Sequence, residues 1–228
     1  MVYHRGGEMV HYIERDDGFL DPMETGYYFM SHEAWSEGEK ASLMEVRGRV
    51  LDVGCGAGRT ALLLQERGHE VVAIDVSPLA LEVSRLRGVR DCRLMDVRAM
   101  DFPEAHFDTV VMYGNNFGIG GGVEETRAVL QGLYQVTKEN GRVIASTRDP
   151  LETDNPAHLA YHQRNQERGQ PPGLVKIRVV FGGESSEWFK LLMLGRHELT
   201  ELLEPTTWRV ERLYDSGADY FFALGKKP

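Results

Sequence analysis

The stretch VLDVGCGAG, residues 50–58, decides the fold of this chain. Its opening residues are apolar apart from Asp52, a composition that predicts a short strand buried in a parallel sheet. Gly54 and Gly56 can adopt positive φ angles and let a ligand approach the backbone. A helix predicted to begin at Arg59 would point its unpaired amides at anionic or polar groups. The stretch therefore predicts a strand, a tight turn and a helix that together bind a ligand.

Strand-like apolar runs alternate with helical patterns throughout residues 48–146. Such alternation predicts parallel strands joined by crossover helices, which is the doubly wound, Rossmann-like α/β class. The third helix is predicted to end before Asn140-Gly141, a pair typical of turns. The predicted strands are 49–53, 71–75, 92–95, 109–113 and 142–146, and the predicted helices are 59–67, 78–87 and 124–137.

Different patterns flank this core on both sides. The arm before it carries the aromatic residues Tyr27 and Tyr28 and a helical pattern from Ser31 toward Val46. After the core, a polar helix is predicted from Asn155 to about residue 168. Alternating apolar residues on either side of a glycine pair at 182–183 then predict an inserted antiparallel hairpin. A short helix and two strands at the end of the chain predict a final antiparallel strand in the sheet. We expect one domain, in which residues 1–48 are the arm, 49–148 the core, 149–195 the inserted cap and 196–228 the C-terminal helix and strand pair.

Composition excludes several classes of partner. The 228 residues include 26 Lys and Arg against 35 Asp and Glu, a formal net charge of −9, which disfavours binding to nucleic acid and to anionic membranes. The two cysteines, Cys55 and Cys92, are too few for a zinc site or a disulfide framework, so no metal is expected. No apolar run is long enough to cross a bilayer, and residues 1–14 are polar. These features predict a cytoplasmic protein.

Three acids at predicted strand ends indicate which ligand the turn binds. Asp75, about twenty residues after the turn, can accept hydrogen bonds from both hydroxyls of a ribose. Arg59 stands where a dinucleotide-binding turn would have its third glycine, which argues against NAD. Asp52 would disfavour a pyrophosphate but can attract the ammonium and sulfonium charges of S-adenosylmethionine. Asp96 closes the next strand and, with the backbone of Val97, can meet the adenine amino group.

At this point the sequence resembles the class I S-adenosylmethionine-dependent methyltransferases of the small-molecule branch. Residues 50–58 match the glycine motif of that family, and Asp75 matches its ribose acid. Residues 95–97, 107–113 and 141–144 resemble its adenine site, its methyl-transfer pocket and its fifth-strand motif. The resemblance implies S-adenosylmethionine as cofactor and a seven-strand sheet whose last strand is antiparallel. The predicted cofactor-binding residues are Asp52, Gly54, Cys55, Gly56, Arg59, Asp75, Val76, Asp96, Val97, Tyr113 and Asn115.

The residues that would meet the methyl acceptor are less specific. Tyr113 and Asn116, after the fourth strand, are candidates, although asparagine and glycine are also typical of turns. Residues 118–122 are predicted to be a flexible connection that leaves room for a bulky substrate. His158 and His162 share one helix face, so one of them could act as a general base or both could bind a metal. Because that helix lacks an apolar stripe, the simpler interpretation is that both histidines are solvated.

The sequence therefore predicts a methyltransferase that moves a methyl group to a small molecule by in-line displacement. The alternatives are a non-catalytic protein that senses S-adenosylmethionine and, with less support, a nicotinamide-dependent oxidoreductase. Absence of an Asn-Pro-Pro-Tyr or Asp-Pro-Pro-Tyr motif argues against methylation of adenine or of a glutamine amide. Trp188 and Phe189 on the hairpin could wall a pocket, fill a core or join a homodimer. As a hypothesis, the N-terminal arm closes over the cofactor.

Overall fold

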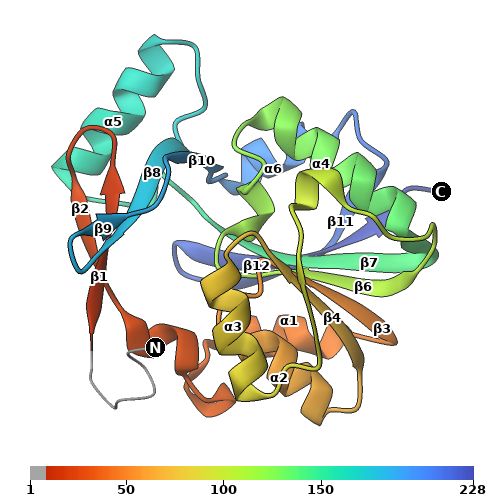
Figure 1. The fold of residues 1–228 in the computed structure, drawn as a ribbon. Coiled ribbons are helices and arrows are strands. Elements are labelled where there is room, and N and C mark those ends of the chain that lie inside the picture. Colours follow the sequence, from red (N-terminus) through yellow and green to blue (C-terminus); the bar gives the residue numbers. More distant parts are fainter. Residues whose placement is uncertain (1–8) are drawn as a thin grey trace.

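The computed structural model describes residues 9–228, which contain two β-sheets (Figure 1). The larger sheet, here called the central sheet, is built from β3 (Arg49–Val53), β4 (Glu70–Asp75), β5 (Asp91–Leu94), β6 (Phe107–Met112), β7 (Thr137–Arg148), β11 (Trp208–Ser216) and β12 (Asp219–Lys226). Its strand order is β11-β12-β7-β6-β3-β4-β5. The strands from β7 to β5 pair in parallel, and β12 is antiparallel to both of its neighbours. The predicted mostly parallel sheet with an antiparallel last strand is confirmed.

Helices cover both faces of the central sheet (Figure 1). On one face lie α1 (Glu37–Ser42), α2 (Arg59–Glu66) and α3 (Pro78–Arg87), and on the other lie α4 (Val123–Val136) and α6 (Arg196–Leu203). Successive strand residues point to opposite faces. Val50 accordingly packs in one core cluster with Leu64 of α2, and Leu51 packs in the other with Leu133 of α4. Among residues 9–228, no helix has both the length and the apolar character that a membrane crossing requires.

Local signals set the ends of several helices as predicted. Ser77 precedes α3 and its hydroxyl accepts a hydrogen bond from the amide of Ala80 at 3.2 Å, while Pro78 occupies the first position. Gly88 ends the same helix with φ 106°, in the left-handed region that glycine adopts without strain. Asn155 caps α5 (Pro156–Glu167) by accepting a hydrogen bond from Ala157 at 2.9 Å.

Two predicted features of the core and the arm are wrong. The helix expected from Ser31 toward Val46 is reduced to α1, because the Ser36 hydroxyl caps the chain there by accepting from the Glu39 amide. The segment before it forms short 3-10 turns. Asn140-Gly141 is not a turn either, since β7 follows α4 directly and runs through it. A side chain at Gly141 would lie 2.3 Å from the Thr137 methyl carbon, so this glycine permits close packing.

The smaller sheet, here called the cap sheet, combines strands of the N-terminal arm with strands of the segment inserted after β7. It consists of β1 (Val10–Arg15), β2 (Leu20–Glu24), β8 (Leu174–Phe181), β9 (Glu184–Ser185) and β10 (Phe189–Leu192). β8 and β9 form a hairpin around Gly182-Gly183, as predicted, and β10 continues the pairing along the same edge of β8. The sequence analysis did not predict that β1 and β2 of the arm complete this sheet, in which β1 pairs with β8. The first eight residues of the predicted arm lie outside the described part of the chain.

The cap sheet is fixed to the core through the glycine-rich segment 118–122, which was predicted to be flexible. Gly118 is buried, and a Cβ atom there would lie 1.8 Å from the carbonyl oxygen of Leu192 in β10. A Cβ atom at Gly121 would lie 3.0 Å from Cβ of Lys190 in the same strand. The prediction of an open connection is therefore wrong. These two positions require glycine because β10 packs directly against their backbone and leaves no room for a Cβ atom.

Candidate functional site

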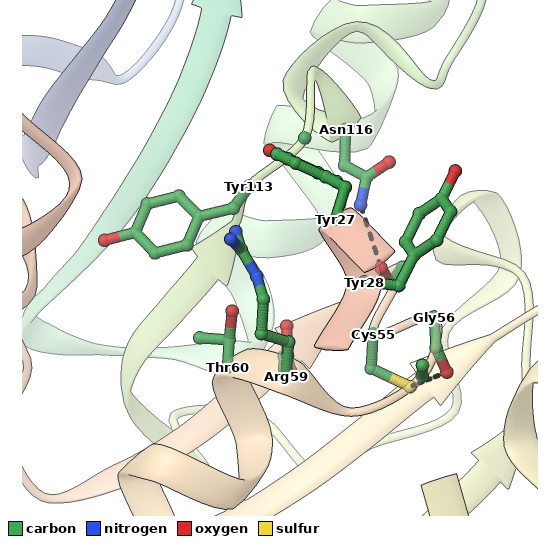
Figure 2. A pocket seen from close by; sticks show the side chains of 12 residues that line it. Tyr27, Tyr28, Cys55, Gly56, Arg59, Thr60, Tyr113 and Asn116 are labelled. Atoms are coloured by element: carbon green, nitrogen blue, oxygen red, sulfur yellow. Dashed lines mark hydrogen bonds between the residues drawn. The ribbon is translucent and has the colours of Figure 1, made fainter. Parts of the chain in front are cut away.

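A cavity of about 220 Å³ opens at the carboxyl ends of β3 and β6 (Figure 2). This is the edge of a parallel sheet at which α/β proteins bind ligands. The loops after β3 and β6 form most of its wall, and the 3-10 turn Thr25–Phe29, which follows β2, covers one side. The lining residues are Tyr27, Tyr28, Asp52, Gly54, Cys55, Gly56, Ala57, Arg59, Thr60, Tyr113, Gly114 and Asn116.

The glycine turn after β3 has the backbone that its sequence predicts. Gly54, Gly56 and Gly58 have φ angles of 69°, 54° and 77°, a region that side chains other than glycine rarely adopt. Nothing lies within 4 Å of the position that a Cβ atom of Gly56 would occupy, so a ligand can approach the backbone there. The Asn116 amide closes the other side of the turn, donating hydrogen bonds to the carbonyls of Val53 at 3.1 Å and Gly54 at 2.9 Å.

Asp52 is a buried carboxylate at the floor of the cavity. It is 3% exposed, and its Oδ2 atom has no hydrogen-bond partner among residues 9–228. Burial, and then the nearby charge of Asp75, raise the pKa of Asp52 to about 7. A backbone hydrogen bond at Ala61 and the charge of Arg59 oppose this rise in the pKa. The group can therefore exchange a proton near neutral pH, and a cation beside it would favour its ionised form.

Arg59, at the start of α2, is held by the N-terminal arm. Its guanidinium forms an ion pair with Glu39 and lies over the rings of Trp35, at 4.2 Å, and Tyr27, at 4.9 Å. Its Nη1 atom is buried without a hydrogen-bond partner among the described residues. Burial has the largest effect on the pKa of Glu39 and raises it, although the charge of Arg59 opposes this rise. Arg59 therefore joins the arm to the glycine turn, a contact that the sequence analysis missed.

The other two predicted acids lie at neighbouring strand ends. Asp75 ends β4, and its two carboxylate oxygens accept hydrogen bonds from the amides of Gly56, at 2.9 Å, and Ser77, at 2.8 Å. Asp96 follows β5, accepts from the amide of Arg98 and forms an ion pair with its guanidinium at 2.5 Å. That ion pair lowers the pKa of Asp96. Of the adjoining residues, Val97 is buried, whereas Val76 is 64% exposed and open to a flat ligand.

Several predicted residues have structural contacts that compete with a chemical role. The Tyr113 hydroxyl lies 2.7 Å from the hydroxyl of Ser42, and its ring points away from Tyr28 (Figure 2). Burial raises the pKa of Tyr113, so its hydroxyl stays protonated. Asn115 has φ 67° and forms a turn. Burial also raises the pKa of the Cys55 thiol, so the thiol stays protonated and is a poor nucleophile.

The histidine pair of α5 lies on the side of the cap sheet, where the His158 ring contacts Phe19, and it is absent from the lining of the cavity described above. The ring centroids of His158 and His162 are 6.4 Å apart. His162 is 5% exposed, so the interpretation that both histidines are solvated is wrong. This helix buries a polar face, on which the Asn165 amide donates to the Leu174 carbonyl at 2.7 Å, whereas Nδ1 of His162 has no hydrogen-bond partner among residues 9–228. No group of three or more His, Cys, Asp or Glu among residues 9–228 is arranged to hold a metal ion.

Fold and cavity together define an α/β protein with a nucleoside-type site at the ends of its parallel strands. The chain matches the family described as "Methyltransferase domain" over residues 50–141. It is 36% identical over 106 residues to the cypemycin N-terminal methyltransferase of a Streptomyces species, a match that covers 45% of this chain and 43% of that protein. A malonyl-[acyl-carrier protein] O-methyltransferase of Erwinia pyrifoliae is 35% identical over 100 residues, which are 43% of this chain and 37% of that protein. The matches thus span less than half the length of these curated relatives.

Similarity to solved structures extends over the whole chain. An S-adenosylmethionine-dependent methyltransferase from Bacteroides fragilis, solved with S-adenosyl-L-homocysteine, superposes with a TM-score of 0.83 and is 27% identical, covering 99% of this chain and 91% of that one. The cap sheet and arm are therefore shared with that relative as well as the core. Residues 50–141 thus match a methyltransferase domain, and the chain is similar over its length to an S-adenosylmethionine-dependent methyltransferase, which implies S-adenosylmethionine as its cofactor.

Proposed function

We propose that this chain transfers the methyl group of S-adenosylmethionine to a small-molecule acceptor. Two opposite charges in one cavity carry the proposal: Asp52 Oδ2 and Arg59 Nη1 are both buried without a partner among residues 9–228. Buried charged atoms are costly when unpaired, so a pair of this kind favours a ligand that completes both. The amino acid part of the cofactor carries an ammonium and a carboxylate, which match Asp52 and Arg59 respectively.

The adenosine part of the cofactor has matching residues on the next two strands. Asp75 would hold the ribose while it orders the glycine turn through the Gly56 amide. Asp96 and the backbone of Val97 would meet the adenine, and the exposed Val76 would lie beside it. When bound, the cofactor supplies a methyl group on a positively charged sulfur. These roles follow from the family resemblance together with the position of each residue at a strand end.

Orientation and exclusion of water are the main tasks of the protein in such a displacement. The Asn116 amide fixes the loop after β6 to the glycine turn, so the wall of the cavity is set before any ligand arrives. Tyr27 and Tyr28 cover the cavity from the arm (Figure 2). A side-chain base is needed only when the acceptor arrives protonated.

The acceptor would lie between the cavity and the cap sheet. Gly118, two residues after the lining residue Asn116, lies directly against Leu192 of β10, so the loop that walls the cavity contacts the cap sheet. The relatives named above methylate, by their names, a peptide N-terminus and a malonyl group on a carrier protein. These names support acceptors of modest size with an oxygen or nitrogen nucleophile.

Ligand-dependent unfolding tests the cofactor part of the proposal. S-adenosylhomocysteine at a hundredfold excess over its dissociation constant should add about 2.7 kcal/mol to the free energy of unfolding, whereas NAD should add nothing. Turnover tests the reaction: the protein is incubated with methyl-labelled S-adenosylmethionine and a metabolite extract, and labelled products are identified. Stabilisation by NAD alone would contradict the proposal, and stabilisation by the cofactor without any labelled product would favour a sensor.

A further inference from the structure

A histidine of the cap sheet contacts a tyrosine that lines the cavity. His11 lies in β1 and Tyr28 in the turn that follows β2, and the distance from His11 Nε2 to the Tyr28 hydroxyl oxygen is 3.2 Å. Their ring centroids are 5.6 Å apart. Tyr28 belongs to the cavity lining, so this contact links the cavity to a group that can accept a proton. The histidine pair of α5, which the sequence analysis considered as a possible base, has no such link to the lining residues described here.

We propose that Tyr28 and His11 together remove a proton from the methyl acceptor, with Tyr28 receiving it and passing its own proton to His11 Nε2. This inference rests on the proposed function. It implies an acceptor whose nucleophilic atom arrives protonated, either a hydroxyl group or an amine. The hydroxyl of Tyr28 lies at the end of its ring that is directed away from the glycine turn (Figure 2). That direction leads toward the cap sheet, where His11 lies.

The protonation states of the pair suit a proton transfer in this direction. Burial lowers the pKa of His11, which is 5% exposed, so its imidazole is neutral at pH 7. Burial, and then the neighbouring Tyr27, raise the pKa of Tyr28, so its hydroxyl holds a proton and donates it to the imidazole. The groups that face the pair are Met23, opposite His11 in β2, and Tyr27, which itself lies beside Arg59.

The step balances in atoms and electrons. The acceptor atom forms a bond to the methyl carbon with its lone pair, and the carbon–sulfur bond breaks with both electrons remaining on sulfur. The proton of the acceptor moves to the Tyr28 oxygen while the Tyr28 proton moves to His11 Nε2. The product is an imidazolium ion, which releases its proton to water. Relays of this kind contribute roughly 10²- to 10⁴-fold to a rate.

Two variants and two matched controls test the pair. Tyr28→Phe and His11→Gln remove the relay, whereas Tyr12→Phe, on the next residue of β1, and His197→Gln, at an exposed site of α6, should change nothing. The dissociation constant of S-adenosylhomocysteine is measured by calorimetry, and methyl transfer to a panel of phenols and amines is measured from about pH 4.5 to 9, a range that extends below the ordinary histidine pKa of 6.5. We expect unchanged dissociation constants within twofold, at least a hundredfold slower transfer in both variants, and loss of the acidic limb of the pH profile.

Two results would overturn the pair while leaving the proposed function intact. One is transfer by both variants at the wild-type rate with the wild-type pH profile. The other is a tenfold weaker binding of S-adenosylhomocysteine by Tyr28→Phe, which would assign the hydroxyl to the cofactor. Nitrogen NMR gives a readout that needs no acceptor: in the S-adenosylhomocysteine complex at pH 7 we expect His11 to be neutral and protonated on Nδ1. An imidazolium, or a proton on Nε2, would contradict the relay. Failure of the proposed function would instead appear in the wild-type protein as a lack of cofactor binding.

Discussion

At the scale of single residues, the most informative group is Asp52. A carboxylate placed inside a strand between two layers of helices loses its hydration, and its pKa rises to about 7 for that reason. A protein gains nothing in stability from such a group, so its presence at the end of β3 is explained by a cationic ligand. Arg59 lines the same cavity, and its Nη1 atom has no hydrogen-bond partner among residues 9–228, so the ligand is also expected to carry an anionic group.

Cofactor affinity should therefore depend on pH through Asp52. Below pH 7 the carboxylate is increasingly protonated and attracts the cofactor's positive charges less, so the dissociation constant should fall as the pH rises from 6 to 8. Calorimetric titration with S-adenosylmethionine at several pH values measures this. Asp52→Asn should bind more weakly and with a flatter profile, while Asp101→Asn, an exposed control, should match the wild type. An identical slope in Asp52→Asn would assign the pH dependence to another group.

The same substitution should stabilise the protein in the absence of ligand. The folded-state pKa of Asp52 lies above the ordinary value of 3.8, so folding is favoured when the group is protonated, and this contribution is lost as the pH rises through about 7. At pH 8, Asp52→Asn should raise the free energy of unfolding by something on the order of 2–4 kcal/mol. Urea unfolding at pH 5 and pH 8 measures it, with a smaller gain expected at pH 5. Destabilisation at pH 8 would show that the carboxylate has a structural partner.

At the scale of elements, prediction from sequence succeeded where short-range rules decide the structure. The residues around Asp52, the helix cap at Ser77 and the acid at Asp75 are each set by a strand end or a turn. The strands of the arm were not predicted, because the pairing of β1 with β8 joins residues more than 160 positions apart and has no local signature in the sequence. His11 comes beside Tyr28 through the pairing of β1 with β2, in which His11 lies opposite Met23. The sequence analysis predicted no strand in the arm, so the α5 histidines were the ones it considered as a possible base.

The contact of β10 with the glycine-rich segment 118–122 predicts how a substitution at Gly118 changes stability. Gly118→Ala would place a methyl group 1.8 Å from the Leu192 carbonyl oxygen, so either β10 or the segment must move. We expect a loss of about 1–3 kcal/mol in the free energy of unfolding. Gly26→Ala is the matched control, since nothing lies within 4 Å of its Cβ position. Urea unfolding of both variants checks this, and equal stability of the two would mean that the cap sheet is not fixed at Gly118.

The packing of α5 should be sensitive to acid. Burial, and then His158, lower the pKa of His162 below its ordinary value of 6.5. The unfolded chain therefore takes up the proton first, and the free energy of unfolding should fall as the pH drops below about 6.5. Amide hydrogen exchange in α5 should be faster at pH 5.5 than at pH 7.5, after correction for the intrinsic rate. His162→Gln should reduce this difference, whereas His197→Gln, an exposed control, should not. Equal pH dependence in both variants would exclude His162 as the cause.

At the scale of the whole molecule, one continuous segment connects the two parts that must meet for methyl transfer. β2 of the cap sheet runs directly into the turn Thr25–Phe29 over the cavity, and the chain then enters α1, whose Glu39 pairs with Arg59. A ligand in the cavity therefore touches a segment that is tied to the cap at one end and to α2 at the other. Closure of the arm over the cofactor and positioning of the cap are expected to be coupled.

This coupling predicts which amides a bound cofactor should protect. Saturating S-adenosylhomocysteine should slow hydrogen exchange at residues 25–42 as well as in the glycine turn, because Tyr27 and Arg59 pack against each other at the cavity. In Arg59→Lys the guanidinium that lies over Trp35 is lost, so protection should shrink in the arm while it persists at Gly56. Mass spectrometry of peptides from both regions measures the two effects separately. Protection confined to the glycine turn in the wild-type protein would show that the arm does not close on the cofactor.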